Sequence, residues 1–334
     1  MNPLGFYSLE QEPFSNAPVS RFYFDSAQNQ AALLRLERVI RDMKGLGVMI
    51  GDVGAGKTTL ARKLLDSLPE NEYEAALLAI IPSGVTADWL LRRIAQQLGV
   101  SDPAREKLQL LSQLYKRLLQ IAESGRKAIV LIDEAQMLQS REIMEEFRGV
   151  LNLEIPGKKL ITFVFFGLPE IEQNLKLDPP LLQRVAVKCR LNPMDLESTR
   201  KYIDHRLVLA GAKEEIFDES AKEAVYRFSK GSPRLVNTLC DNALFEGALV
   251  SKKKIDSEIV ARVAGDLGVG DASLQEAPRA LVEESPERPE PSFSQSLQAE
   301  FEEIRPETTD ERPFLRSDES MDPEKIIDEL EETS

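Results

Sequence analysis

Continuous apolar stretches, rather than alternating ones, mark the strands that the sequence predicts between residues 46 and 191. Such stretches are typical of parallel strands covered on both faces. The predicted strands are residues 47–50, 75–81, 127–132, 160–166 and 185–191. Between them the apolar residues recur with the period of a helix. The predicted helices are residues 58–68, 87–98, 104–123 and 140–151. This alternation predicts an α/β fold, a parallel sheet with flanking helices.

Beyond this region the strand signal disappears, and only helical periodicity remains. The predicted helices are residues 196–210, 219–229, 233–246 and 257–266. We therefore expect a small all-helical domain after the sheet. Before the sheet, a proline-punctuated aromatic segment leads into a helix at about residues 28–43. The predicted division of the chain is 1–45, 46–192, 193–268 and a tail at 269–334.

Charge changes the interpretation of the tail. The chain carries a formal net charge of −14, from 42 Lys and Arg and 56 Asp and Glu. Residues 271–334 hold 20 acidic and 6 basic residues, which leaves 36 of each in residues 1–270. A stretch with so many acidic residues and so few apolar ones is predicted to be disordered. Within it, residues 322–332 have helical spacing and are either a frayed end or a short helix that docks on a partner.

Composition excludes several other classes of protein. No apolar stretch approaches the ~18 residues of a membrane span, and the N-terminus lacks the pattern of a secretory signal. Two cysteines do not make a disulfide framework, and a single histidine argues against a zinc site. From the sequence we expect a soluble cytoplasmic protein.

One motif predicts a phosphate site with high specificity. Residues 51–58 read GDVGAGKT, a full GxxxxGK[ST] between an apolar strand and a helix. Backbone N–H groups of such a loop surround phosphate, the lysine reaches the β- and γ-phosphates, and the hydroxyl of Thr58 can ligate Mg²⁺. The residues expected to contact ATP are Gly51, Asp52, Val53, Gly54, Ala55, Gly56, Lys57, Thr58 and Thr59.

A second motif places two carboxylates after a buried strand. Four apolar residues at 129–132 precede Asp133 and Glu134. Ligands of open α/β sheets bind at this carboxyl end of the strands. We expect Asp133 to hold Mg²⁺ and Glu134 to orient or deprotonate the attacking water. The glutamate favours ATP hydrolysis over binding alone.

These pieces, taken in order, resemble a family of AAA+ P-loop ATPases. The stretches that carry the resemblance are YSLEQEPFSNAP at 7–18, GDVGAGKTT at 51–59, LIDEAQ at 131–136, FFGLPEIEQNL at 165–175 and GSPRLVNTLCDNAL at 231–244. The sequence is similar to the ExeA, or general secretion protein A, type, which is related to the TniB and MuB transposition ATPases and to the Orc/Cdc6 ATPases. The resemblance covers residues 7–265 and implies a P-loop NTPase core at 46–192, followed by a helical lid at 193–268.

The resemblance also implies roles for two arginines. Arg234 resembles the sensor arginine of the lid, which contacts the γ-phosphate and stabilises its charge. Arg184 resembles the arginine finger that a neighbouring subunit supplies, with Arg190 and Arg148 as alternatives. Each of these three assignments of the finger implies a homo-oligomer.

The sequence departs from the family at Leu168, where a polar residue usually helps to position the attacking water. Gln136 either compensates with its amide or is a surface glutamine. The aromatic N-terminal segment, with Tyr7 and Phe14, either borders the adenine pocket or attaches the segment to the domain. Two further assignments follow from spacing alone: Trp89 is expected in the core, and Lys252–Lys254 in a solvated turn.

Three functions remain open. The first is a Mg²⁺-dependent ATPase that assembles or powers an envelope secretion, pilus or polysaccharide-export apparatus, recruited from the cytoplasm to the inner membrane by a protein partner that the acidic tail selects. The second, less favoured, is a DNA-associated switch ATPase, which requires a basic stripe from residues such as Arg62, Lys63, Arg92 and Arg93. The third is a regulatory ATP-binding protein whose turnover is slow because of Leu168.

Overall fold

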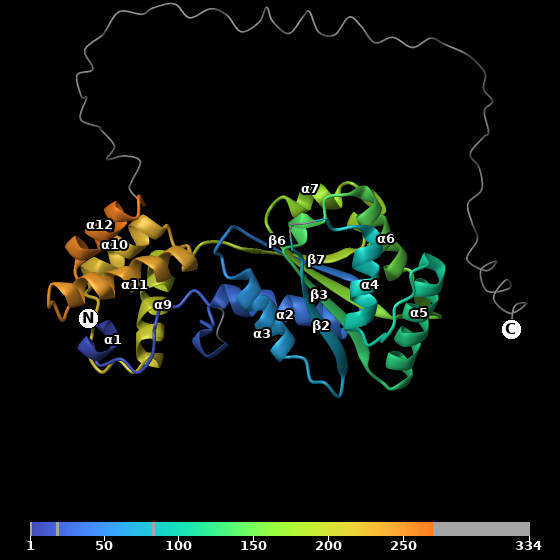
Figure 1. Cartoon of the computed structure of the whole chain (residues 1–334), viewed down its shortest axis with the longest axis horizontal. Coiled ribbons are helices and arrows are strands. Elements are labelled where there is room, and N and C mark those ends of the chain that lie inside the picture. The colour runs from blue at the N-terminus through green and yellow to red at the C-terminus, as the bar shows by residue number, and fades with distance from the viewer. Residues whose placement is uncertain (1, 18–19, 82–83, 270–334) are drawn as a thin grey trace, which may run out of the picture. The chain divides into compact units, whose positions relative to one another are not determined.

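The computed structural model describes residues 2–17, 20–81 and 84–269 of the 334-residue chain. The predicted tail beyond Val269, including the short helix at 322–332, therefore lies outside the described residues. The sheet has five strands in the order β2-β3-β6-β1-β7, and all neighbouring pairs are parallel (Figure 1). The strands are β1 (Leu46–Gly51), β2 (Tyr73–Ala79), β3 (Lys127–Asp133), β6 (Ile161–Gly167) and β7 (Val185–Leu191). The predicted parallel sheet is confirmed.

Burial differs between the middle and the edge of this sheet. Strands β1 and β6 are buried at every residue, and β3 at all but its first. Along the edge strand β7, exposed residues alternate with more buried ones: Ala186, Lys188 and Arg190 are exposed. The prediction that every strand is covered on both faces is therefore wrong for β7, whose Ala186, Lys188 and Arg190 remain exposed.

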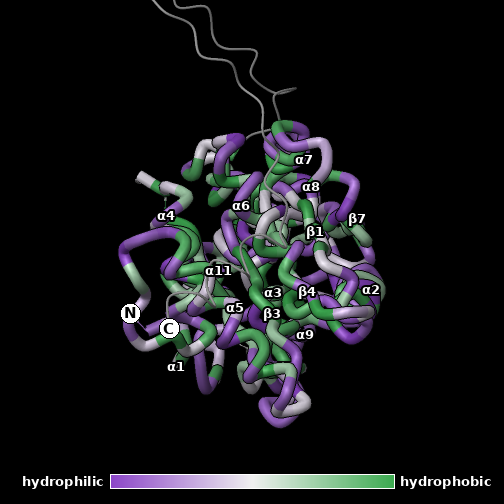
Figure 2. The backbone as a smooth tube through the Cα atoms, turned by 90° about the vertical axis from the view of Figure 1, so that its right-hand side faces the viewer, coloured by the Kyte–Doolittle hydropathy of each residue, from purple (hydrophilic) through white to green (hydrophobic). Residues whose placement is uncertain are grey.

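Two groups of helices cover the two faces of the sheet. Apolar residues of α4, α5 and α6 pack with Val48, Val130 and Phe163 in one core. Those of α2 and α3 pack with Met49 and Ile129 in another. The helices are α2 (Ala27–Arg41), α3 (Lys57–Asp66), α4 (Ala87–Gln97), α5 (Lys107–Glu123) and α6 (Arg141–Leu151). Figure 2 shows the resulting alternation of hydrophobic and hydrophilic stretches along the helices.

The starts of these helices follow from their capping residues. The hydroxyl oxygens of Ser26, Thr86 and Ser140 each accept a hydrogen bond from the backbone N–H three residues later, at 3.2 Å. In the helical region, Asp195 and Asp218 cap two helices in the same way. A side-chain oxygen at this position satisfies an N–H that the helix leaves without a partner.

The four predicted C-terminal helices form a bundle with its own core. They are α9 (Leu196–Leu209), α10 (Glu219–Ser229), α11 (Pro233–Leu249) and α12 (Ser257–Asp266). The N-terminal segment packs into this bundle, although α2 directly after it packs on the sheet. Phe14 is 1% exposed in the bundle core, and the hydroxyl of Tyr7 donates to the carbonyl oxygen of Lys252 at 3.0 Å. Of the two interpretations of Tyr7 and Phe14, attachment of the segment is therefore the one that the structure supports.

Several short elements carry too little periodicity to be predicted from sequence. They are α1 (Pro3–Phe6), η1 (Ser20–Phe22), η2 (Ala135–Met137), the hairpin of β4 (Glu154–Ile155) and β5 (Lys158–Lys159), α7 (Ile171–Leu175) and α8 (Pro179–Leu182). Among the described residues, no helix combines the length and the apolar character that a membrane span requires.

Trp89 lies on the surface, so its predicted core position is wrong. Its side chain is 41% exposed, whereas Leu90, Leu91 and Ile94 of the same helix are buried. The buried face of α4 is already filled by these three residues. Trp89 lies to one side of it.

Candidate nucleotide site

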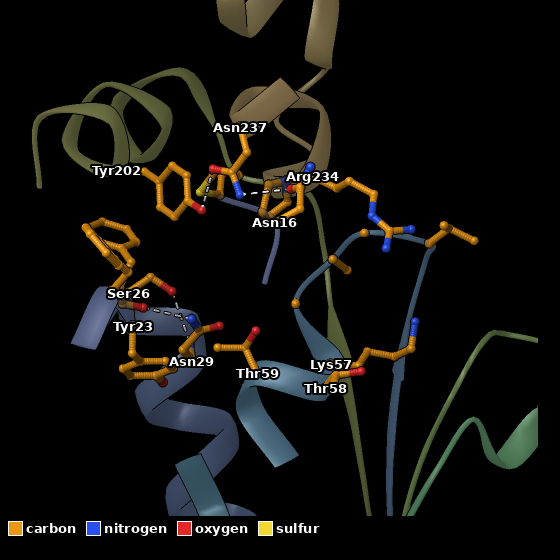
Figure 3. Close-up of a pocket in the computed structure, with 18 of the residues that line it drawn as sticks. Asn16, Tyr23, Ser26, Asn29, Lys57, Thr58, Thr59, Tyr202, Arg234 and Asn237 are labelled. Carbon is orange, nitrogen blue, oxygen red and sulfur yellow. Dashed lines mark hydrogen bonds between the residues drawn. The ribbon is translucent and has the colours of Figure 1, made fainter. Parts of the chain in front are cut away.

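A cleft of about 400 Å³ opens at the carboxyl end of the sheet, within the size range of small-molecule sites. On one side lies the phosphate wall, which we define as residues 53–59 at the start of α3. On the other lies the bundle wall, which we define as Asn16, Tyr202, Arg206 and Asn237. Figure 3 shows Asn16, Tyr202 and Asn237 of the bundle wall across the cleft from Lys57, Thr58 and Thr59 of the phosphate wall. Tyr23, Ser26 and Asn29 lie beside them. Glu134 and Leu168 also line the cleft.

The glycine-rich loop forms directly after β1 and leads into α3. The side chain of Lys57, only 7% exposed, folds back into the loop. Its Nζ donates to the carbonyl oxygens of Gly51 at 2.9 Å and Asp52 at 3.0 Å. Burial lowers the pKa of Lys57, and the carboxylates of Glu134 and Asp133 oppose that shift. A cation desolvated in this way gains a strong partner when an anion enters the loop.

Thr58 and Asp133, the two predicted metal ligands, are in direct contact. The hydroxyl of Thr58 donates to Oδ2 of Asp133 at 2.7 Å. Oδ1 of Asp133 accepts from the backbone N–H of Glu134 at 3.0 Å, which fixes the carboxylate at the end of β3. A hydroxyl and a carboxylate at this spacing fit the oxygen ligands that Mg²⁺ prefers.

Gln136 is buried, so its interpretation as a surface glutamine is wrong. It is 4% exposed. Its Nε2 donates to Oε2 of Glu134 at 2.5 Å, and its Oε1 accepts from the backbone N–H of Leu168 at 3.0 Å. The amide therefore joins the end of β3 to the end of β6.

The backbone of Arg234 contacts the glycine-rich loop directly. Its N–H donates to the carbonyl oxygen of Gly54 at 3.3 Å, and its side chain lines the cleft. A Cβ at Gly54 would lie 2.7 Å from the Cβ of Arg234, and Gly54 has a φ of 77°. Glycine at this position therefore serves both the turn of the loop and the close approach of α11.

The bundle wall is a hydrogen-bonded group around a buried guanidinium. Arg206, 4% exposed, donates from Nη1 to the hydroxyl of Tyr202 at 2.6 Å and to Oδ1 of Asn237 at 2.8 Å. Its Nη2 donates to the carbonyl oxygen of Ser15 at 3.2 Å, and its Nε is buried without a hydrogen-bond partner among the described residues. This group was not predicted from the sequence. Its only sequence signal is the pair Tyr202 and Arg206, four residues apart on one helix face.

Known proteins share both the sequence and the fold. A family model described as an AAA domain matches residues 40–175. Over 253 residues the chain is 34% identical to general secretion pathway protein A of Aeromonas hydrophila, which covers 75% of this chain and 46% of that protein. The chain thus spans about half of that relative's length.

Two archaeal structures have a similar fold at low identity. The ORC2 protein of Aeropyrum pernix, solved as ADPNP and ADP complexes, has a TM-score of 0.60 and 14% identity over 77% of this chain and 72% of that one. Cdc6p of Pyrobaculum aerophilum has a TM-score of 0.60 and 18% identity over 76% and 70%.

The chain contains an AAA domain, at residues 40–175. The resemblance to the general secretion protein A type and to the Orc/Cdc6 fold is confirmed. The AAA+ fold explains why the residues at 51–59, 133–134 and 234, far apart in sequence, meet at one edge of the sheet.

The predicted arginine finger lies elsewhere in the AAA+ fold. Arg184 does not belong to the described residues that line the cleft. It directly precedes β7, whose first residue pairs with Leu46 at the start of β1, whereas the glycine-rich loop follows the other end of β1. Its Nη1 donates to the carbonyl oxygen of Arg148 at 3.4 Å. Arg148 is paired with Asp178, and Arg190 with Glu172.

The three lysines at 252–254 all have partners. Lys252 pairs with Asp256 and Lys254 with Glu215. Lys253 donates to the carbonyl oxygen of Phe6 and lies 4.1 Å from the centre of its ring. This run is thus a turn that binds its own neighbours.

Proposed function

We propose that this protein binds ATP with Mg²⁺ in the cleft and hydrolyses it to ADP and phosphate. The observation that carries the proposal is the convergence of Lys57, the Thr58–Asp133 pair and Glu134 at one edge of the sheet. Each of the three contributes a group that phosphoryl transfer requires: a cation, a metal site and a base for water.

Each group of residues in the cleft has its own role in this reaction. The phosphate wall and Lys57 bind the phosphates, with the positive end of the α3 dipole behind them. Thr58 and Asp133 would hold Mg²⁺, which would neutralise charge on the phosphate oxygens when bound. Glu134 accepts the proton of the attacking water. Arg234 reaches the γ-phosphate from the bundle.

We further propose that the ATPase serves an envelope secretion apparatus. The support is the 34% identity with general secretion pathway protein A. In this proposal copies of the chain assemble with nucleotide, and Arg184 acts on the site of the neighbouring copy. That function agrees with its position at the edge of the sheet opposite its own glycine-rich loop. The acidic residues 271–334 recruit the protein to its membrane partner.

The decisive experiment measures binding and hydrolysis separately. Wild-type protein should bind a fluorescent ATP analogue and release phosphate in the presence of Mg²⁺. We expect Lys57→Ala to weaken binding at least ~100-fold. Glu134→Gln should retain binding and lose turnover by ~100-fold or more. Tight binding by Lys57→Ala, or full turnover by Glu134→Gln, would contradict the proposal.

The role of assembly has its own test. Activity of the wild type should rise more steeply than in proportion to protein concentration, and Arg184→Ala subunits should inhibit mixed assemblies. The DNA-associated alternative stays a prediction without a structural observation in its favour. Salt-dependent binding of duplex DNA by the ATP-bound protein would revive it.

A further inference from the structure

The link between Glu134 and Gln136 has a single possible orientation. The backbone N–H of Leu168 can only donate, so the atom of Gln136 that faces it must be the amide oxygen. The amide NH₂ is thereby directed at the carboxylate of Glu134, which can only accept when ionised. The two partners thus fix the direction of both hydrogen bonds.

The surroundings hold Gln136 in this place. Its backbone carbonyl oxygen accepts from Nδ2 of Asn174, on α7, at 2.8 Å. A Cβ at Gly167 would lie 3.2 Å from the backbone nitrogen of Gln136 and 3.3 Å from its Oε1. The absence of a side chain at Gly167 therefore leaves the room that the amide occupies. The buried amide has little freedom to turn, because both of its ends are bonded and its backbone is anchored.

Two features of Glu134 make a hydrogen-bond partner important for the position of its carboxylate. Its backbone has a φ of 56°, in the left-handed region that non-glycine residues seldom adopt. Its side chain is half-buried and lines the cleft. With Oε2 held by Gln136, the other carboxylate oxygen is the one that remains for water in the cleft.

We propose that Gln136 is the positioning residue that aims the carboxylate of Glu134 at the attacking water, in place of a polar side chain at position 168. The proposal rests on the hydrolysis of ATP at this site. The side chain of Leu168 has no polar atom, but its backbone N–H fixes Gln136, and Gln136 fixes Glu134. The backbone at the end of β6 thus positions the carboxylate of Glu134 through the side-chain amide of Gln136, which lies in η2 directly after β3.

The test compares kcat with nucleotide affinity in the full chain. Gln136→Ala should lower kcat ~100-fold, the effect of a misdirected catalytic group, and change the affinity for ATP less than about threefold, because Gln136 does not line the cleft. Gln136→Glu keeps the size of the side chain and removes the NH₂ donor. Its kcat should fall by the same factor, so Gln136→Glu can replace Gln136→Ala in the test if the alanine variant does not fold.

A double-mutant cycle separates positioning from general support of the fold. If Gln136 acts only through Glu134, Gln136→Ala in the Glu134→Gln background should cause less than about a threefold further loss of kcat. If the losses of kcat from the two substitutions multiply in the double variant, Gln136 acts independently of Glu134, and the proposal is overturned. A thermal unfolding curve for each variant confirms that the compared proteins are folded.

Two variants on α7 complete the design. Asn174→Ala removes the hydrogen bond to the backbone of Gln136 but not its side chain, and should lose less kcat than Gln136→Ala. An equal loss would assign the effect to the turn and overturn the proposal. Gln173→Ala, exposed on the same helix, is the unchanged control. If the wild type hydrolyses ATP and Gln136→Ala keeps its kcat, only this inference fails. If the wild type does not hydrolyse ATP, the proposed function fails with it.

Discussion

The phosphate wall of the cleft is one continuous stretch of chain, whereas the bundle wall combines the N-terminal segment with two helices that begin at Leu196 and Pro233. In the first, neighbours in sequence make the site: Lys57 bonds to Gly51 and Asp52. In the second, the partners of Arg206 lie up to 191 residues away. A local site keeps its geometry when the rest of the protein shifts, but a site built from distant segments depends on tertiary packing. Four substitutions test this difference.

The largest effect is expected at Gly231, which precedes the bundle helix that carries Arg234. A Cβ there would lie 1.8 Å from the carbonyl oxygen of Met194, and its φ is 76°. Gly231→Ala should therefore reduce the free energy of unfolding by about 3 kcal/mol, through overpacking and backbone strain together. Gly265→Ala is the matched control, since it lies in α12 with open space around it, and should be neutral or stabilising. Equal unfolding temperatures for both variants would contradict this account.

Arg206 tests the bundle wall itself. Arg206→Met keeps the packing of the stem but removes the hydrogen bonds to Tyr202, Asn237 and Ser15. We expect a loss of about 2 kcal/mol, the size typical of hydrogen bonds from charged groups, together with weaker ATP binding. Urea unfolding measures the first and titration with the analogue the second. Arg38→Met, which breaks only an exposed pair with Asp42, should cost less than about 0.5 kcal/mol.

Gly54, in the phosphate wall, contacts α11, the helix that carries Asn237 of the bundle wall. Gly54→Ala should weaken ATP binding about tenfold, or about 1.4 kcal/mol. Gly157→Ala, in the β4–β5 hairpin, has a similar φ of 76° but no neighbour within 4 Å. It should show the backbone strain without any change in nucleotide affinity. Unchanged affinity in Gly54→Ala would mean that the two walls are not coupled at this contact.

The smallest effect is expected at Tyr7, whose hydroxyl attaches the N-terminal segment to the bundle. Tyr7→Phe should cost about 1 kcal/mol near neutral pH. Burial raises the pKa of Tyr7 to about 12 from an ordinary value of 10.0. The ionised form is thus disfavoured in the fold, and stability that is complete below pH 10 should fall as the pH rises towards 12.

Tyr7→Phe should reduce this alkaline loss. It should not abolish it, because Tyr23, whose pKa burial also raises to about 12, contributes in the same range. Identical stability curves for wild type and Tyr7→Phe between pH 9 and pH 12 would contradict the burial of this hydroxyl.

Local chemistry explains why so much of the phosphate wall could be predicted from sequence. The loop needs glycines, a lysine and a threonine at fixed spacing, and the buried middle strands need unbroken apolar residues. Position 168 could be identified from sequence as lacking its polar side chain. The burial of Gln136 could not be predicted from sequence, because it depends on Gly167 and Asn174, which belong to other elements.

The bundle wall was missed for the same reason. Nothing in the local sequence around Arg206 distinguishes a buried guanidinium from an exposed one, and its partner Ser15 comes from a segment that carries no helical period. The edge strand β7 and Trp89 are errors of a related kind. An apolar pattern shows that a segment has a buried face, but the neighbours that cover it are set by topology.

The packing of the N-terminal segment against the bundle has a mechanical consequence. The chain crosses between the bundle and the sheet twice, once between Phe24 and α2 and once between β7 and α9. The second is a direct chain connection, and the first holds as long as the N-terminal segment stays packed in the bundle core. Two connections restrict the rotation of the bundle against the sheet more than one would. Nucleotide-dependent movement of Arg234 should therefore be more restricted than one connection would allow, and removal of the first 24 residues would leave the bundle with a single connection to the sheet.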